Sequence, residues 1–205
     1  LNIANAGAVT IGGVGPNFTG LHVNTAGDLR LIAGGYIDLA DVDGLESVHG
    51  GAISGDVFLT AIGADADVSS QVDRDAIMAQ AGNITVTAER NILFGTAVAN
   101  QNSDVLANGS ITLSAGRSIF LDGLADVVSD SFGNDTGGGV TATAVNNLFV
   151  FGSEASIGAA GNAGADVTLT TTGENGLVIV GAFPVNPVFS ISGDVTINAD
   201  RMLIA

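Results

Sequence analysis

The sequence predicts an all-β fold, a parallel β-helix (solenoid) of about seven to eight coils with a period of roughly 27 residues. Three observations support this class. A similar segment recurs along nearly the whole chain, each copy alternates apolar and polar residues, and no segment shows the 3.6-residue period of an amphipathic helix. Coils of this length stack strand upon strand and bury a continuous interior that no single coil could bury alone.

The repeat begins at a small residue and continues into an apolar strand. Successive starts are 28, 27, 27, 29, 27 and 28 residues apart, and a weaker eighth copy, "GAVTIGG", begins at Gly7. The seven copies begin at Gly27, Gly55, Gly82, Gly109, Gly138, Ala165 and Gly193. We expect the opening glycines to form corners, because glycine permits close backbone approach and positive φ.

Each copy predicts two strands and a third, weaker apolar patch. In the first strand we expect these side chains to point inward: Leu29, Leu31, Val57, Leu59, Ile84, Val86, Ile111, Leu113, Val140, Ala142, Val167, Leu169, Val195 and Ile197. In the second strand the expected inward set is Ile37, Leu39, Ile92, Phe94, Ile119, Leu121, Leu148, Val150, Leu177, Ile179 and Leu203. The third patch contains Val23, Ile53, Ile77, Val105, Ile157 and Ile191.

Composition excludes several classes of partner. The formal net charge is −16, lysine is absent and all five basic residues are arginine, so we expect no nucleic acid partner. The longest strongly apolar run, "GLVIVGAF", is too short to span a bilayer, so we expect no membrane insertion. Cysteine is also absent, which excludes disulfides and thiol chemistry.

The pattern G-[DNS]-[VI]-T-[LVI]-[ST]-A, followed by a small corner and an apolar triplet, resembles the repeats of filamentous-haemagglutinin-like exoproteins. The segments "GNITVTAERNILF", "GSITLSAGRSIFL" and "GDVTINADRMLIA" carry the resemblance best. It implies a right-handed β-helical shaft that a Gram-negative bacterium exports by two-partner secretion, through an outer-membrane transporter. It also implies an extracellular or cell-surface location and a role in adhesion, aggregation or biofilm. The family's coil is shorter, which implies inserted residues in most coils here.

We expect residues 1–205 to form a single β-helix segment of a longer repeat protein. The chain starts inside the strand-like "LNIA" and ends on the strand "RMLIA", and neither end carries a polar capping element.

Two outward-facing surfaces are candidate sites. The first strand predicts a threonine ladder, either an ice-binding type of array or a solvated strand face that suits β-branched residues: Thr85, Thr87, Thr112, Ser114, Thr141, Thr143, Thr168 and Thr170. The second strand predicts an apolar interaction stripe, covered either by a segment of this chain or by another chain: Leu93, Phe120, Phe149, Val178 and Ile204.

Chemistry at metal or catalytic centres has weaker support. "DVDG" resembles the start of a calcium loop, which makes Asp41 and Asp43 a calcium candidate beside the alternative of solvated turn aspartates. We expect no other cofactor. Arg90 and Arg117 would stack at one corner beside Glu89, as a corner salt bridge or as part of a catalytic groove. His22 and His49 have no serine nucleophile nearby.

The sequence therefore predicts a non-catalytic structural shaft of a secreted or surface-displayed bacterial adhesin. Its partner would be a host or bacterial surface receptor, or a second copy of itself. Two alternatives stay open: a self-assembling fibre or surface-layer component that packs through the apolar stripe, and a carbohydrate-active β-helix enzyme.

Overall fold

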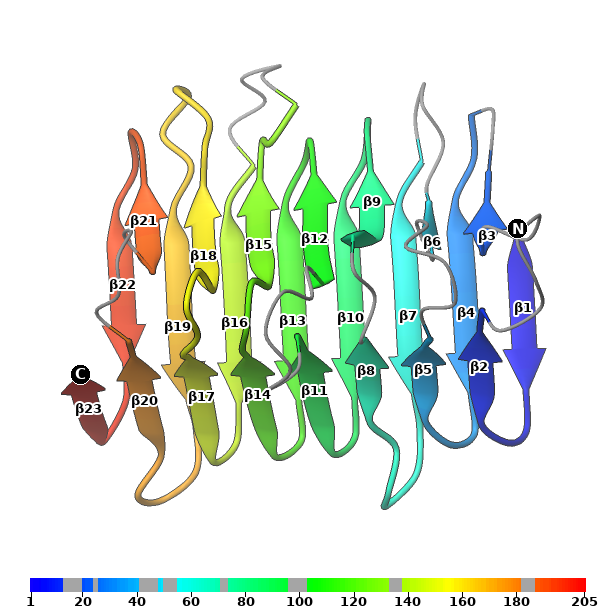
Figure 1. The fold of residues 1–205 in the computed structure, drawn as a ribbon, viewed down its shortest axis with the longest axis horizontal. Coiled ribbons are helices and arrows are strands. Elements are labelled where there is room, and N and C mark those ends of the chain that lie inside the picture. The colour runs from blue at the N-terminus through cyan, green and yellow to red at the C-terminus, as the bar shows by residue number, and fades with distance from the viewer. Residues whose placement is uncertain are drawn as a thin grey trace.

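A computed structural model describes residues 1–12, 20–23, 26–40, 48–49, 55–70, 74–95, 103–132, 138–181 and 187–205. These residues form strands, turns and bends, and every strand pair is parallel. The strands make three sheets that lie along one elongated body, from the blue N-terminus at the right of Figure 1 to the red C-terminus at the left. The chain visits the three sheets in turn, which confirms the parallel β-solenoid.

Sheet A has eight strands. They are β1 (Asn2–Asn5), β4 (Leu29–Ala33), β7 (Val57–Ala61), β10 (Ile84–Ala88), β13 (Ile111–Ala115), β16 (Val140–Ala144), β19 (Val167–Thr171) and β22 (Val195–Asn198). Sheet B also has eight strands. They are β2 (Val9–Ile11), β5 (Ile37–Leu39), β8 (Val68–Ser70), β11 (Asn91–Phe94), β14 (Ser118–Leu121), β17 (Asn147–Val150), β20 (Leu177–Val180) and β23 (Arg201–Ile204).

Sheet C has seven strands. They are β3 (Leu21–His22), β6 (Val48–His49), β9 (Arg74–Ala79), β12 (Ser103–Ala107), β15 (Asp126–Ser129), β18 (Ser156–Ala159) and β21 (Val188–Ser190). The third apolar patch of the repeat is thus a third wall of the solenoid.

The core is a set of aliphatic columns that run along the body. In sheet A, Ile84 pairs with Ile111, Ile111 with Val140, and Val140 with Val167, and all four side chains are buried. Alternate side chains of every strand point into the same interior. This column and its equivalents in the other sheets therefore form one core that excludes water. The predicted inward residues of the first strand are confirmed as far as Leu169; Val195 in β22 is 44% exposed and Ile197 is half-buried.

The start of the repeat is explained by contacts between neighbouring coils. A Cβ on Gly82 would overlap the backbone carbonyl of Gly55, so a glycine is required there by close approach and not by positive φ. The next residue then accepts a hydrogen bond from the following coil: Asn83 N–H donates to Asp56 Oδ1 (2.8 Å), and Ser110 N–H donates to Asn83 Oδ1 (2.8 Å). This side-chain ladder is the physical reason for the G-[DNS] pattern.

The first copy and the third patch of the predicted repeat differ from the structure. The copy at Gly7 is not a first strand, because β1 takes that place in sheet A and "VTI" forms β2 in sheet B. In sheet C, Val188 pairs with Ile157, whereas the predicted Ile191 is 60% exposed. In β3 the residue paired with β6 is Leu21 and not the predicted Val23, and the predicted Ile53 lies outside the described residues.

Candidate functional site

The threonine ladder lies in register on the outer face of sheet A. Thr85 pairs with Thr112, which pairs with Thr141, and Thr87 pairs with Ser114, which pairs with Thr143. Thr168 and Thr170 continue the two rows. Towards the N-terminus the first row changes character. Arg30 and Phe58 occupy it there, with the guanidinium 4.1 Å from the ring centroid. The pairing therefore confirms where the ladder lies, while its role stays a prediction.

The apolar stripe lies on the outer face of sheet B, with two of its predicted members wrong. Leu93, Phe120 and Phe149 are adjacent outward residues, and the two phenylalanine rings stack with centroids 4.7 Å apart. The next outward residue is Ile179 and not Val178, which is fully buried. In β23 the register likewise places Leu203, not Ile204, beside Ile179. The stripe is thus Leu93, Phe120, Phe149, Ile179 and Leu203.

The error has a specific cause in the turn before β20. Asn147 in β17 follows Ala144 almost directly, whereas a turn over residues 172–176 separates β19 from Leu177. The turn contains Asn175 in the left-handed region, at φ 65°. The inward residue Val178 follows Val167 by 11 residues, whereas Leu148 follows Val140 by 8, so this turn adds three residues and reverses which side chains of β20 face the core. The connection before β23 is instead one residue shorter, since Met202, the partner of Val178, follows Val195 by 7 residues, and it reverses the faces of β23 separately. Leu177 and Ile179 were therefore expected inward, and Leu203 with them, but these positions face outward.

Four of the five stripe residues help to line an apolar pocket of about 320 Å3. It is lined by Phe120, Leu121, Asp122, Phe149, Phe151, Ile179, Leu203 and Ala205. Phe151 is 55% exposed and Leu203 is 50% exposed. Large apolar side chains that are half exposed to solvent favour contact with another apolar surface.

The outer face of sheet C carries a row of carboxylates that the sequence prediction missed. Asp75 pairs with Asp104, and the continuing register places Asp126 beside Asp104 and Ser156 beside Asp126. Asp104 Oδ1 accepts the Asp126 N–H at 3.0 Å, and Asp126 Oδ1 accepts the Ser156 hydroxyl at 2.5 Å. In β9, β12 and β15 an aspartate lies one or two residues before the inward residue, and this pattern could have revealed the row. The bulge between β9 and β12 changes the number of residues between the aspartate and the inward residue, so the pattern is not regular in the sequence.

Burial and neighbouring charge alter the acidity of this row. The pKa of Asp104 is raised from 3.8 to about 7, chiefly by partial burial; the hydrogen bond from the Asp126 backbone opposes the rise, and the charges of Asp126 and Asp75 add to it. Partial burial also raises the pKa of Asp126, opposed by its hydrogen bond from Ser156, and the charge of Glu154 adds to the rise. Both carboxylates therefore lie in a place that disfavours their own ionised form.

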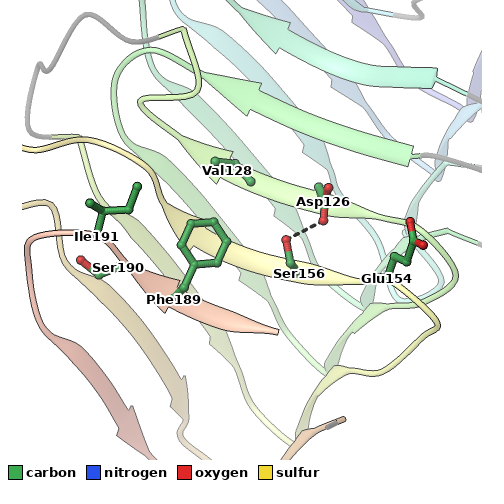
Figure 2. Close-up of a pocket in the computed structure, with 7 residues that line it drawn as sticks. All are labelled: Asp126, Val128, Glu154, Ser156, Phe189, Ser190 and Ile191. Atoms are coloured by element: carbon green, nitrogen blue, oxygen red, sulfur yellow. Dashed lines mark hydrogen bonds between the residues drawn. The ribbon is translucent and has the colours of Figure 1, made fainter. Parts of the chain in front are cut away.

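A pocket of about 500 Å3 opens on this face (Figure 2). It is lined by Asp126, Val128, Glu154, Ser156, Phe189, Ser190 and Ile191. Figure 2 shows the two acidic side chains at one end and Phe189 with Ile191 at the other. Between two of the lining residues lies Gly158, which pairs with Val128 on one side and Phe189 on the other. A Cβ on Gly158 would overlap the Phe189 ring.

The corner considered for catalysis is an ion-pair site. Arg90 donates to both carboxylate oxygens of Asp67, at 2.9 and 2.6 Å, and to Asp65 at 2.9 Å. The hydrogen bonds to Asp67 are the largest cause that raises the pKa of Arg90. Glu89 instead accepts the Gly63 N–H at 2.7 Å. The backbones of Arg90 and Arg117 do stack as expected, through a 2.7 Å hydrogen bond.

The remaining candidates add little chemistry. Asp41 and Asp43 lie outside the described residues, so the calcium prediction stays untested. Within the described part of the chain, no group of three or more histidine or acidic side chains is arranged to hold a metal ion. β3 and β6 place His22 and His49 at partner positions of the backbone.

The fold and these surfaces define the chain as a β-solenoid repeat protein. Comparison of the chain with protein-family models, with curated proteins and with solved structures found no match. Across the residues that the structure covers, no helical segment has the length and apolar character needed to cross a bilayer.

Proposed function

We propose that the chain is a non-catalytic structural shaft of a secreted or surface-displayed bacterial exoprotein of the filamentous-haemagglutinin-like type, acting in adhesion, aggregation or biofilm. One observation carries the proposal: each of the three sheets contains an in-register aliphatic column that continues from coil to coil, Ile84–Ile111–Val140 in sheet A, Ile92–Ile119–Leu148 in sheet B and Val105–Val127–Ile157 in sheet C. Backbone hydrogen bonds between coils and this continuous core make a stiff rod, while the connecting segments can vary freely.

The motif supports the extracellular part of the proposal. The residues that resemble exoprotein repeats are those that stack: "GNITVTAERNILF" and "GSITLSAGRSIFL" form β10–β11 and β13–β14. The absence of cysteine and the charge of −16 suit a chain that crosses membranes unfolded and then remains soluble. Its expected partner is a surface receptor of the host or of another bacterium.

Antibody labelling of the source bacterium tests the location. Antibodies raised against the purified chain should label intact cells or precipitate the protein from culture medium. Labelling that appears only after lysis would contradict the proposal. Beads coated with the chain should also attach to target cells, and attachment no greater than that of albumin-coated beads would refute the adhesive role.

The second candidate is lateral self-assembly through the sheet B stripe, favoured by the stacked pair Phe120–Phe149 and the apolar pocket that both rings line. Phe120→Asp or Phe149→Asp should disperse any assembly into monomers, as measured by sedimentation velocity. Thr112→Asp, which adds the same charge on the exposed face of sheet A, is the matched control. Unchanged assembly in the phenylalanine variants would eliminate this candidate.

A further inference from the structure

The sheet C pocket has two chemically distinct halves. Asp126 and Glu154 supply two carboxylates at one end, while Val128, Phe189 and Ile191 make an apolar wall at the other. Among the described residues no basic side chain lines the pocket. A pocket of about 500 Å3 is within the usual size range of ligand sites, about 300–1,000 Å3.

The acidic half lacks a countercharge within the described part of the chain. The charge of Glu154 opposes ionisation of Asp126, and Asp104 lies next to Asp126 on the neighbouring strand. Ser156, whose hydroxyl donates a hydrogen bond to Asp126, is uncharged. A cation placed between the two carboxylates would relieve this repulsion, because opposite charges in a partly desolvated site attract more strongly than in water.

The apolar half of the pocket indicates that the cation belongs to a side chain with a long aliphatic stem. Phe189 and Val128 belong to one outward row of sheet C, and Asp126 and Ser156 belong to the row two positions away along the strands. Two positions span about 6.6 Å, a distance that a long side chain bridges. An aliphatic stem lying over the Phe189 ring would bring its charged head to the acidic end.

We propose that this pocket binds an arginine side chain of a partner polypeptide. The guanidinium is planar and offers five donors, so it can serve both carboxylates at once, whereas an ammonium is a point charge. A second copy of the chain is a poorer source than a basic partner, because the chain has only five arginines against 21 acidic residues. Three of its five arginines are engaged in their own contacts, namely Arg30, Arg90 and Arg201. The inference needs only the folded solenoid and does not depend on display at a cell surface.

Peptide titrations test the proposal. The probe is the acetylated and amidated pentapeptide Gly-Ser-Arg-Ser-Gly. Its control carries citrulline, an uncharged isostere, in place of arginine. Amide signals of Ser156 and Phe189 in isotope-labelled protein report binding. The arginine peptide should bind at least about fivefold more tightly than the citrulline peptide, and added salt should reduce the difference.

Variants locate the site. Glu154→Gln should weaken the arginine peptide about threefold. Glu174→Gln makes the same charge change at an exposed turn residue that does not line the pocket, and should leave binding unchanged. Equal binding of the two peptides, no signal change at Ser156 and Phe189 at millimolar peptide, or equal effects of the two variants would overturn the proposal. Agmatine that binds as tightly as the arginine peptide would overturn the assignment to a polypeptide.

Discussion

Removing the charge of Asp104 should stabilise the protein at neutral and alkaline pH. Asp104→Asn keeps the shape of the side chain, and its amide oxygen can still accept the Asp126 N–H. The carboxyl titrates at about 7 in the folded chain instead of 3.8. The folded state therefore binds more protons than the unfolded state between these two values, and its stability falls as the pH rises through them.

The magnitude follows from the size of the shift. A rise of about three pKa units corresponds to about 4 kcal/mol at 1.36 kcal/mol per unit. Since the carboxyl keeps part of its contact with solvent, we halve this figure, to about 2 kcal/mol. Asp104→Asn should thus raise the free energy of unfolding by about 2 kcal/mol at pH 8 and leave it unchanged near pH 4.

Urea unfolding followed by circular dichroism at several pH values between 4 and 8 measures this difference. Asp166→Asn is the matched control, because Asp166 is exposed and accepts the same kind of bond, from the Asp194 N–H at 2.8 Å. We expect the control to lack the pH-dependent gain. A difference between the Asp104 variant and the parent that is independent of pH, or a loss of stability at pH 8, would refute the reasoning.

Four further substitutions test packing, each by urea unfolding. Val178→Asp should destabilise the protein by at least about 4 kcal/mol because it buries a charge, whereas Ile179→Asp should change stability by no more than about 1 kcal/mol. If Ile179→Asp were the more destabilising of the two, Ile179 and not Val178 would face the core, as the sequence predicted. Gly95→Ala should destabilise by about 2 kcal/mol or more, because φ is 79° and a Cβ would overlap the Asp122 carbonyl. Ile111→Ala should cost about 3 kcal/mol, and a cost below about 1 kcal/mol would contradict burial in the shared column.

The stacking in sheet A could be predicted because the distance from each opening glycine to the first strand is constant. Ile84, Ile111 and Val140 lie at the same place in each copy, and period-two alternation then fixes which side faces the core. The close approach that requires the opening glycine, and the hydrogen bonds that favour Asp, Asn or Ser after it, recur at the same place in neighbouring copies. Fold class and core therefore follow from a local pattern.

Sheets B and C could be predicted only in part, because their register depends on turns of variable length. The longer turn before Leu177 reverses the faces expected for β20, so that Val178 faces the core and Ile179 faces outward. The carboxylate row escaped prediction because Asp104 is unremarkable in sequence. It becomes notable only when coil stacking places Asp75 and Asp126 on either side. A site formed across coils is visible in the sequence only once the register of each turn is known.

Disulfide trapping tests the stacking register most directly, since the chain has no cysteine of its own. Thr112 and Thr141 are paired on adjacent strands, which lie about 4.8 Å apart, within the Cα separation of a disulfide. Thr112 and Thr143 lie on the same face, but about 8 Å apart along the diagonal, beyond that separation. Under mild oxidation the Thr112→Cys/Thr141→Cys variant should form an intramolecular disulfide and the Thr112→Cys/Thr143→Cys variant should not. Efficient closure of the second pair but not the first would show that neighbouring coils do not stack in this register.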